Sequence, residues 1–82
     1  MSEKERDYIP VSCTIYSGYE LAIMHRQRLR VAWRDPDGGH HVGTLRPLDL
    51  ETRDAQEFLI ARTEAGHSVR LRLDWIRSSE GL

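Results

Sequence analysis

The chain has 82 residues, of which 13 are acidic and 12 are basic, so its formal net charge at pH 7 is −1. This length fits one small domain, which has little room for a deep catalytic cleft. The balanced charge argues against a protein that binds nucleic acid through excess positive charge alone. All but one of the basic residues are arginines, whose planar side chains suit two-point contacts.

The single cysteine, Cys13, cannot form an intramolecular disulfide, so the sequence lacks the framework of a small secreted domain. No apolar run approaches the length of a membrane-spanning helix. The first seven residues, MSEKERD, lack the basic and apolar regions of a signal peptide. We therefore expect a cytoplasmic protein in which residues 1–7 form a disordered tail.

A helix is predicted near the N-terminus. Pro10 favours an extended conformation at the residue before it, and Ser12 then is a candidate N-cap for a helix that ends near Arg26. A second possible start is Ser17, because Ser-Gly-Tyr-Glu has the spacing of a capping box. Helical spacing of apolar residues predicts the side chains that face the core, which are Ile15, Tyr19, Ala22 and Ile23.

After the helix, apolar and polar residues begin to alternate, which predicts strands. The first strand is expected at 28–35 and is followed by the turn sequence DPDGG. The second is expected at 40–50. There Gly43 indicates a bend or bulge, and Pro47 indicates an edge or the end of the strand.

The last third of the chain is predicted to contain further strands. Residues 51–55, ETRDA, are expected to form a loop, and strands are expected at 56–63 and 68–74. A short fifth strand is possible from Trp75 onward. One helix followed by four or five antiparallel strands predicts a mainly β fold, whose sheet packs under the helix or curls into a small barrel.

Motifs for catalysis or metal binding are not evident. His40 and His41 are adjacent, so on a strand they would point to opposite faces. No second ligand lies at a usual metal-binding spacing from Cys13, and no neighbouring base is indicated that would activate its thiol. We expect Cys13 to be partly buried and the protein to be neither an enzyme nor the carrier of a metal or other cofactor.

Charges are unevenly distributed along the chain. Residues 26–34 contain four arginines and no acidic residue, whereas residues 49–57 contain four acidic residues and one arginine. Arginines at predicted outward strand positions could stay solvated, pair across strands, or contact RNA beside Trp33 or Trp75 as a stacking platform. These arginines are Arg28, Arg30, Arg70 and Arg72.

Tyr16 and Glu20, close to the helix start, raise a different possibility. An aromatic ring beside carboxylates could imitate nucleic acid toward a basic, base-stacking groove, because the ring offers a π face and the carboxylates offer phosphate-like charge. The alternative is structural, with Glu20 capping the helix and Tyr16 packing at the core or its rim.

Several short motifs resemble a known family in their order and spacing. They are Tyr8-x-Pro10-x-x-Cys13-x-x-Tyr16, Glu20-x-Ala22, Asp49-Leu50, Arg53, Glu57-x-Leu59 and Arg72-Leu73-Asp74-x-Ile76. Together they are similar to the Rho-binding antiterminator family over residues 8–77. The resemblance implies an Sm-like fold, in which an N-terminal helix leads into a small, strongly bent antiparallel β-barrel. Residues 78–82 would then be a C-terminal tail.

The resemblance also implies a function. Members of the family bind the transcription termination factor Rho at the primary RNA-binding site of its N-terminal domain, which prevents RNA loading and lowers termination. Carried over by position, the partner-binding residues are Tyr16, Ser17 and Glu20 of the helix, and Arg53, Asp54 and Ala55 of a loop. We therefore expect a regulator of transcription termination, with an Sm-like module that binds single-stranded RNA directly as the alternative.

Three residues at the helix start differ from the enterobacterial members of this family. Thr14, Ile15 and Ser17 stand where those members have acidic residues, and Asp54 stands where they have lysine. The helix start of this chain therefore carries less negative charge toward the proposed partner.

Overall fold

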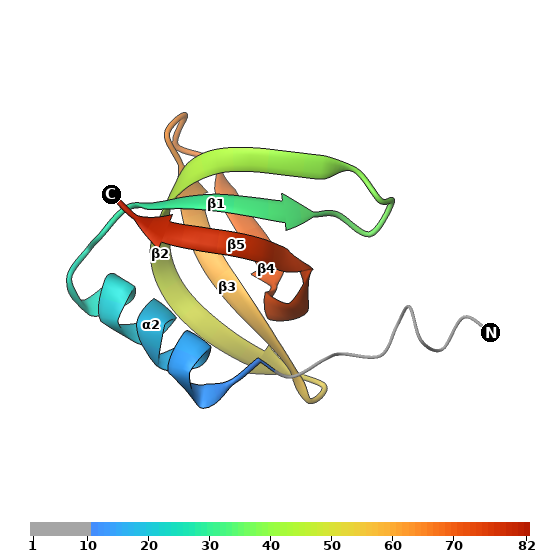
Figure 1. The fold of residues 1–82 in the computed structure, drawn as a ribbon, viewed down its shortest axis with the longest axis horizontal. Helices are drawn as coiled ribbons and strands as arrows, with labels where there is room; N and C mark the ends of the chain where they lie inside the picture. Colours follow the sequence, from blue (N-terminus) through green and yellow to red (C-terminus); the bar gives the residue numbers. More distant parts are fainter. Residues whose placement is uncertain (1–10) are drawn as a thin grey trace.

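The computed structural model describes residues 11–82 (Figure 1). The elements in chain order are α2 (Cys13–Met24), β1 (Leu29–Arg34), β2 (His40–Arg53), β3 (Gln56–Thr63), β4 (Ser68–Arg72), the 3-10 helix η1 (Leu73–Trp75) and β5 (Ile76–Gly81). The prediction of a mainly β fold with one α-helix ahead of the strands is confirmed for this part of the chain. The predicted tail at 1–7, together with Tyr8 and Pro10, lies outside the described residues.

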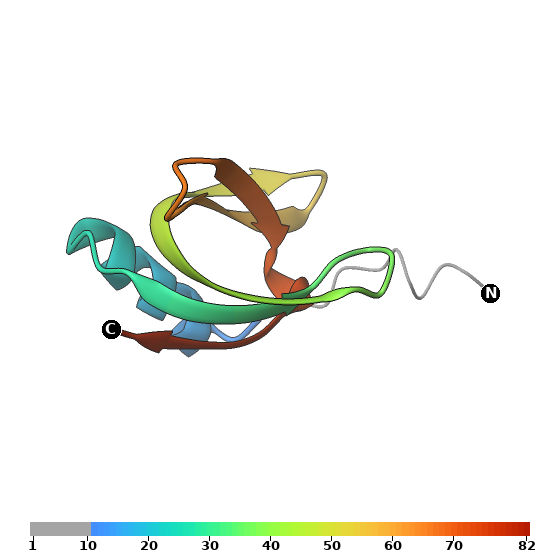
Figure 2. The same ribbon diagram turned by 90° about the horizontal axis from the view of Figure 1, so that it is seen from above.

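The strands form one antiparallel sheet in the order β4-β3-β2-β1-β5. The sheet curves strongly, because the first part of the 14-residue β2 pairs with β1 while the rest pairs with β3 (Figure 2). β4 and β5 lie at the two edges and do not pair with each other, so the sheet is not a closed barrel.

The helix begins where Ser12 predicts, and Ser17 lies within it. The Ser12 hydroxyl accepts a hydrogen bond from the Ile15 backbone N–H at 3.2 Å, which satisfies one of the unpaired donors at a helix start. The helix ends at Met24, because Arg26 adopts a left-handed conformation with a φ of 54°.

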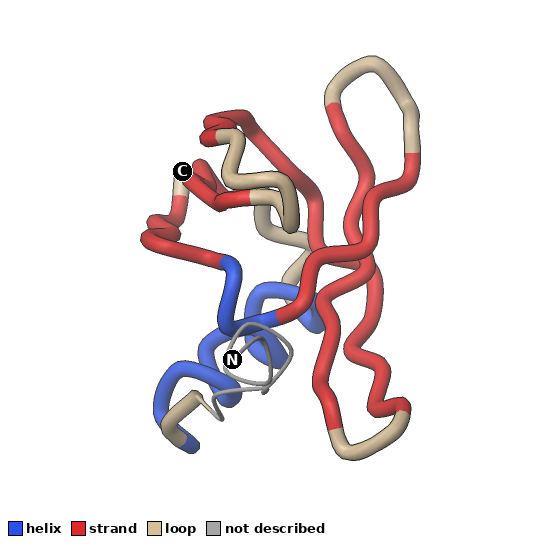
Figure 3. Tube along the Cα trace, turned by 90° about the vertical axis from the view of Figure 1, so that its right-hand side faces the viewer, coloured by secondary structure: helices blue, strands red, loops and turns tan. Residues whose placement is uncertain are grey.

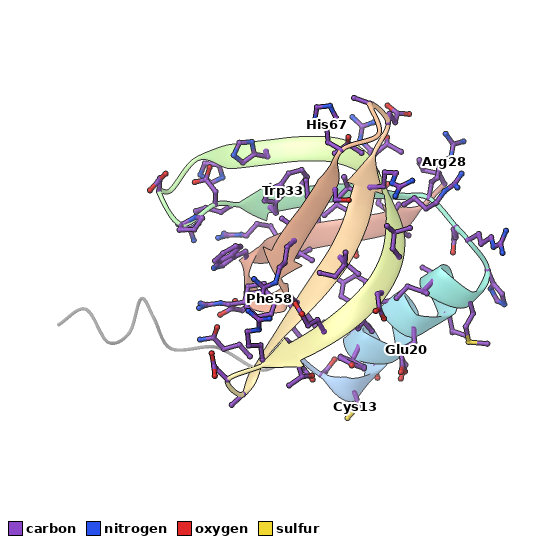
Figure 4. All side chains as sticks on the ribbon, turned by 180° about the vertical axis from the view of Figure 1, so that it is seen from behind. Cys13, Glu20, Arg28, Trp33, Phe58 and His67 are labelled. Carbon is purple, nitrogen blue, oxygen red and sulfur yellow. The ribbon has the colours of Figure 1, made fainter. Side chains whose placement is uncertain are left out.

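Two predictions about exposure on the helix are wrong. Cys13 is exposed rather than partly buried, and it lies in the first turn of the helix at the edge of the molecule (Figure 4). Ile15 is 49% exposed and does not face the core, whereas Tyr19 and Ala22 are buried. The helix touches the sheet along a narrow stripe, so not every apolar residue at helical spacing is covered.

The core lies between α2 and the concave side of the sheet. Its buried apolar side chains are Tyr19, Ala22, Leu29, Val31, Leu45, Leu59, Ala61, Leu71 and Leu73. In β1 and β3, the members of this set alternate with exposed or half-buried residues. The helix packs mainly against β2.

Pro47 does not end the second strand. It is buried, and the register between β2 and β3 shifts between Pro47 and Asp49. Such a β-bulge accommodates a residue that has no backbone N–H to donate. Gly43 pairs in regular register with Val31, so the irregularity lies further along the strand than Gly43.

The predicted loop at 51–55 is therefore largely strand. β2 continues to Arg53, and only Asp54 and Ala55 form the turn to β3. Their φ angles of 53° and 62° are both positive. Positive φ at both central residues is typical of a type I′ turn, whose twist matches that of the flanking strands.

The chain end also differs from the prediction. Residues through Gly81 form β5, which pairs with β1, so most of the expected tail at 78–82 belongs to the sheet.

Arg72 was expected to face outward, but it is only 8% exposed. Its Nε and Nη2 atoms donate to the two carboxylate oxygens of Asp74 at 2.6 and 2.9 Å. This two-point pair compensates the burial of both charges where the chain turns into β5.

The turn between β2 and β3 predicts the effect of a glycine substitution. A Cβ is unfavourable at positive φ, so Ala55→Gly should raise the free energy of unfolding by about 1 kcal/mol. Ala65→Gly is the matched control, because Ala65 is also an exposed turn residue but is not at positive φ. It should lower the stability slightly. Urea unfolding measures both, and equal losses for the two variants would contradict the turn geometry.

Candidate functional site

An open groove of about 560 Å³ lies between α2 and the second half of β2. We call it the α2–β2 groove. It is lined by Tyr16, Ser17, Glu20, Leu21, Ile23, Met24, Asp49 and Leu50. All three helix residues that the family resemblance assigns to partner binding are therefore part of one surface feature.

The helix positions Tyr16 and Glu20 on one face, because residues four apart lie one above the other. Tyr16 is half-buried and packs against the core, while its other side lines the groove. Glu20 is exposed and lies beside the curved part of β2 (Figure 4). Ser17 is exposed in the same turn of the helix.

The pKa of the Tyr16 hydroxyl is raised above its ordinary value. Burial raises the pKa of Tyr16 above its ordinary value of 10.0, and the negative charges of Glu57, Glu20 and Asp49 raise it further. These three carboxylates come from β3, α2 and β2, so only the folded chain brings them together. The groove therefore presents an aromatic ring within a negative electrostatic environment.

Apolar side chains extend the groove along the helix. Leu21 is 52% exposed and Met24 is 71% exposed, and both line the groove together with Leu50. Exposed apolar residues that adjoin one another beside polar groups are typical of surfaces that bind another macromolecule. The sequence analysis did not assign Leu21 and Met24 to a site, although both fall off the predicted core face of the helix.

The other predicted contact residues lie elsewhere. Arg53, Asp54 and Ala55 are exposed at the β2–β3 turn and do not line the groove. Figure 3 shows this turn at the same end of the molecule as the start of α2, but separated from it across the width of the fold. Arg53 is within 4.0 Å of Glu51 on the same strand. The resemblance therefore corresponds to two separate surface features.

The residues expected to bind RNA directly make contacts within the protein. Arg70 donates from Nε to Glu51 at 2.8 Å, and its guanidinium lies 4.0 Å from the centre of the Phe58 ring. The buried Arg72 lies 5.3 Å from the centre of the Trp75 ring. Two of the four arginines of the proposed RNA surface thus have partners within the protein, Arg70 on β2 and β3 and Arg72 in the adjoining η1.

Trp33, one of the two candidate stacking residues, contacts another ring of this chain. Trp33 is stacked on His41, with ring centres 5.4 Å apart. His41 Nε2 also lies 2.7 Å from a carboxylate oxygen of Asp35, in the hairpin between β1 and β2. Arg28 and Arg30 are exposed. This arrangement favours the α2–β2 groove as the candidate functional site.

Over residues 11–82, no group of three or more His, Cys, Asp or Glu side chains could hold a metal ion. The one α-helix of this part of the chain is too short and too polar to cross a membrane.

Comparison with known proteins gives a likeness in fold. No family model matches the chain, and no curated protein matches it. A solved structure of the proteasome accessory factor B/C (PafBC) of Arthrobacter aurescens is similar to it, with a TM-score of 0.74 and 22% sequence identity. The match covers 88% of this chain but 12% of that chain. At this identity the chain shares a small, β-rich fold with part of a much longer protein.

The acidic environment predicts how Tyr16 titrates. A nearby carboxylate disfavours the tyrosinate, so Glu20→Gln should lower the pKa of Tyr16 toward its ordinary value. Because the pKa of Tyr16 is higher in the folded than in the unfolded protein, the protonated hydroxyl contributes to the free energy of unfolding in full below pH 10.0, the ordinary pKa. This contribution should be lost as the pH rises through the raised pKa of the folded state. NMR titration of ¹³C-labelled tyrosine rings measures the pKa, with Glu80→Gln on β5 as the control. An unchanged Tyr16 pKa in Glu20→Gln would contradict this electrostatic environment.

Proposed function

We propose that this protein is a non-enzymatic regulator of transcription termination that binds Rho at its primary RNA-binding site and blocks RNA loading. One observation carries the proposal: the Tyr16 ring lines an open groove, and Glu20, Asp49 and Glu57 lie close enough to its hydroxyl to raise its pKa. The α2–β2 groove is the proposed contact surface.

The chemistry of this groove matches the chemistry of a nucleic-acid strand. Sites that bind single-stranded RNA combine positive charge, which holds phosphates, with surfaces on which bases stack. An aromatic ring with carboxylates around it offers such a site a π face and negative charge in the same small area. A protein with a net charge of −1 can therefore compete locally with RNA without being strongly acidic overall.

The exposed apolar residues of the groove support a protein partner rather than a small ligand. Leu21 and Met24 would lose contact with water when the groove is covered. Interfaces derive much of their affinity from a few buried aromatic and apolar anchors. We assign this anchor role to Tyr16, which lines the groove together with Leu21 and Met24.

The resemblance to the Rho-binding antiterminator family identifies the proposed partner as Rho. It also suggests that the fold is Sm-like, and one helix ahead of a five-stranded, strongly curved antiparallel sheet is compatible with that suggestion. Arg53, Asp54 and Ala55 would make a second contact from the exposed β2–β3 turn.

The proposal predicts that changes in the groove weaken Rho binding. Tyr16→Ala removes the ring and Glu20→Lys reverses a charge, so each should lower the affinity for purified Rho by about 1–4 kcal/mol. Both residues are at least partly exposed, so the variants should stay folded. Asp37→Lys is the control, because it makes a similar charge change in the exposed β1–β2 hairpin.

Isothermal titration calorimetry with Rho measures the affinity, and competition with a labelled RNA shows whether the primary site is blocked. Parent-like binding by both groove variants would refute the proposed surface. Ser17→Glu restores negative charge at the groove and should tighten binding. If the protein instead binds the RNA itself at low salt and leaves Rho unbound, the direct RNA-binding alternative is correct.

A further inference from the structure

A second depression, of about 430 Å³, lies away from the α2–β2 groove and shares no lining residue with it. We call it the arginine pocket. It is lined by Arg28, Thr44, Leu45, Arg46, Leu48, Arg62, Thr63, Glu64 and Gly66. His67 lies in the connection between β3 and β4. Figure 4 shows Arg28 at the same end of the molecule as His67.

Arg46 of β2 and Arg62 of β3 are direct cross-strand partners. Like charges directly opposite each other destabilise a sheet, because their side chains lie on the same face only a few ångströms apart. Both arginines are exposed. Among residues 11–82, neither makes a hydrogen bond or ion pair that would offset the repulsion. The folded protein therefore carries a repulsive pair that an anion between them would relieve.

A third arginine and a few polar groups complete the pocket. Arg28 comes from the connection between α2 and β1, and its Nη1 is 3.9 Å from a carboxylate oxygen of Glu64. Both side chains are more than half exposed, so this contact is weak. Thr44 and Thr63 also line the pocket. Within residues 11–82, the lining contains three arginines and a single acidic residue, which makes this part of the pocket positive.

We propose that the arginine pocket binds a phosphate-bearing anion. Guanidinium groups form two-point hydrogen bonds with phosphate oxygens, and arginines from three separate segments can surround a tetrahedral group. Among the described residues 11–82, no aromatic side chain lines the pocket, so this lining can recognise the phosphate but cannot stack on a base. The volume is that of a small-ligand site. The phosphate can belong to a small molecule or to the backbone of a nucleic acid.

Titration calorimetry with inorganic pyrophosphate, at low ionic strength, tests the proposal on the full chain. The parent should bind pyrophosphate, and Arg46→Gln should bind it about tenfold or more weakly, which corresponds to one lost charge-assisted hydrogen bond. Arg77→Gln is the matched control, because it removes the same charge at an exposed position outside the pocket. No binding by the parent, or equal weakening in the two variants, would overturn the proposal.

A second readout is the thermal stability of the protein. Without an anion, Arg62→Gln should raise the midpoint of thermal unfolding, because it removes the repulsion with Arg46, and pyrophosphate should stabilise this variant less than the parent. A single-stranded oligonucleotide, tested with and without a 5′-phosphate, then identifies the source of the phosphate. If the oligonucleotide binds without its 5′-phosphate and pyrophosphate displaces it, the pocket binds the phosphates of a nucleic-acid backbone. If pyrophosphate binds and neither oligonucleotide does, the ligand is a small molecule.

Discussion

The structure depends on the bending of one long strand. β2 pairs with β1 through its first part and with β3 through its second part, so both halves of the sheet share this strand. The bulge after Pro47 lets the strand continue where a backbone donor is missing. Because the sheet curves around this strand, a short chain can enclose apolar residues such as Leu45 and Leu59 almost completely. A flat sheet with one helix would leave much more of this surface in water.

The same strand separates two surfaces of opposite charge. On one side, the helix packs against β2 through Tyr19 and Ala22 and leaves the α2–β2 groove between them. On the other side, Arg46 and Arg62 belong to the arginine pocket. A nearly neutral protein can therefore present one negative and one positive binding surface. The two proposals rest on different residues, so one can fail without affecting the other.

The element types and most strand boundaries could be predicted from local patterns, because the alternation at 29–34 and the short apolar run within 56–63 depend only on neighbouring residues. The path of β2 could not. Pro47 is usually a sign that a strand ends, and only pairing with β3 allows the strand to continue. The burial of Arg72 was equally hidden, because a carboxylate nearby in the sequence, Asp74, pairs with it only when the chain turns into η1. The exposure of Ile15 followed from the narrow contact between helix and sheet.

By itself, the sequence determined one helix near the N-terminus, with Ser12 as a candidate cap, and a series of antiparallel strands after it. These properties depend on neighbours a few positions apart. Only the tertiary structure decided that Asp49 and Glu57 join Tyr16, and that Arg46 faces Arg62. Such groups come from different strands, and their distances are set by how strands pair and bend, which local spacing does not encode.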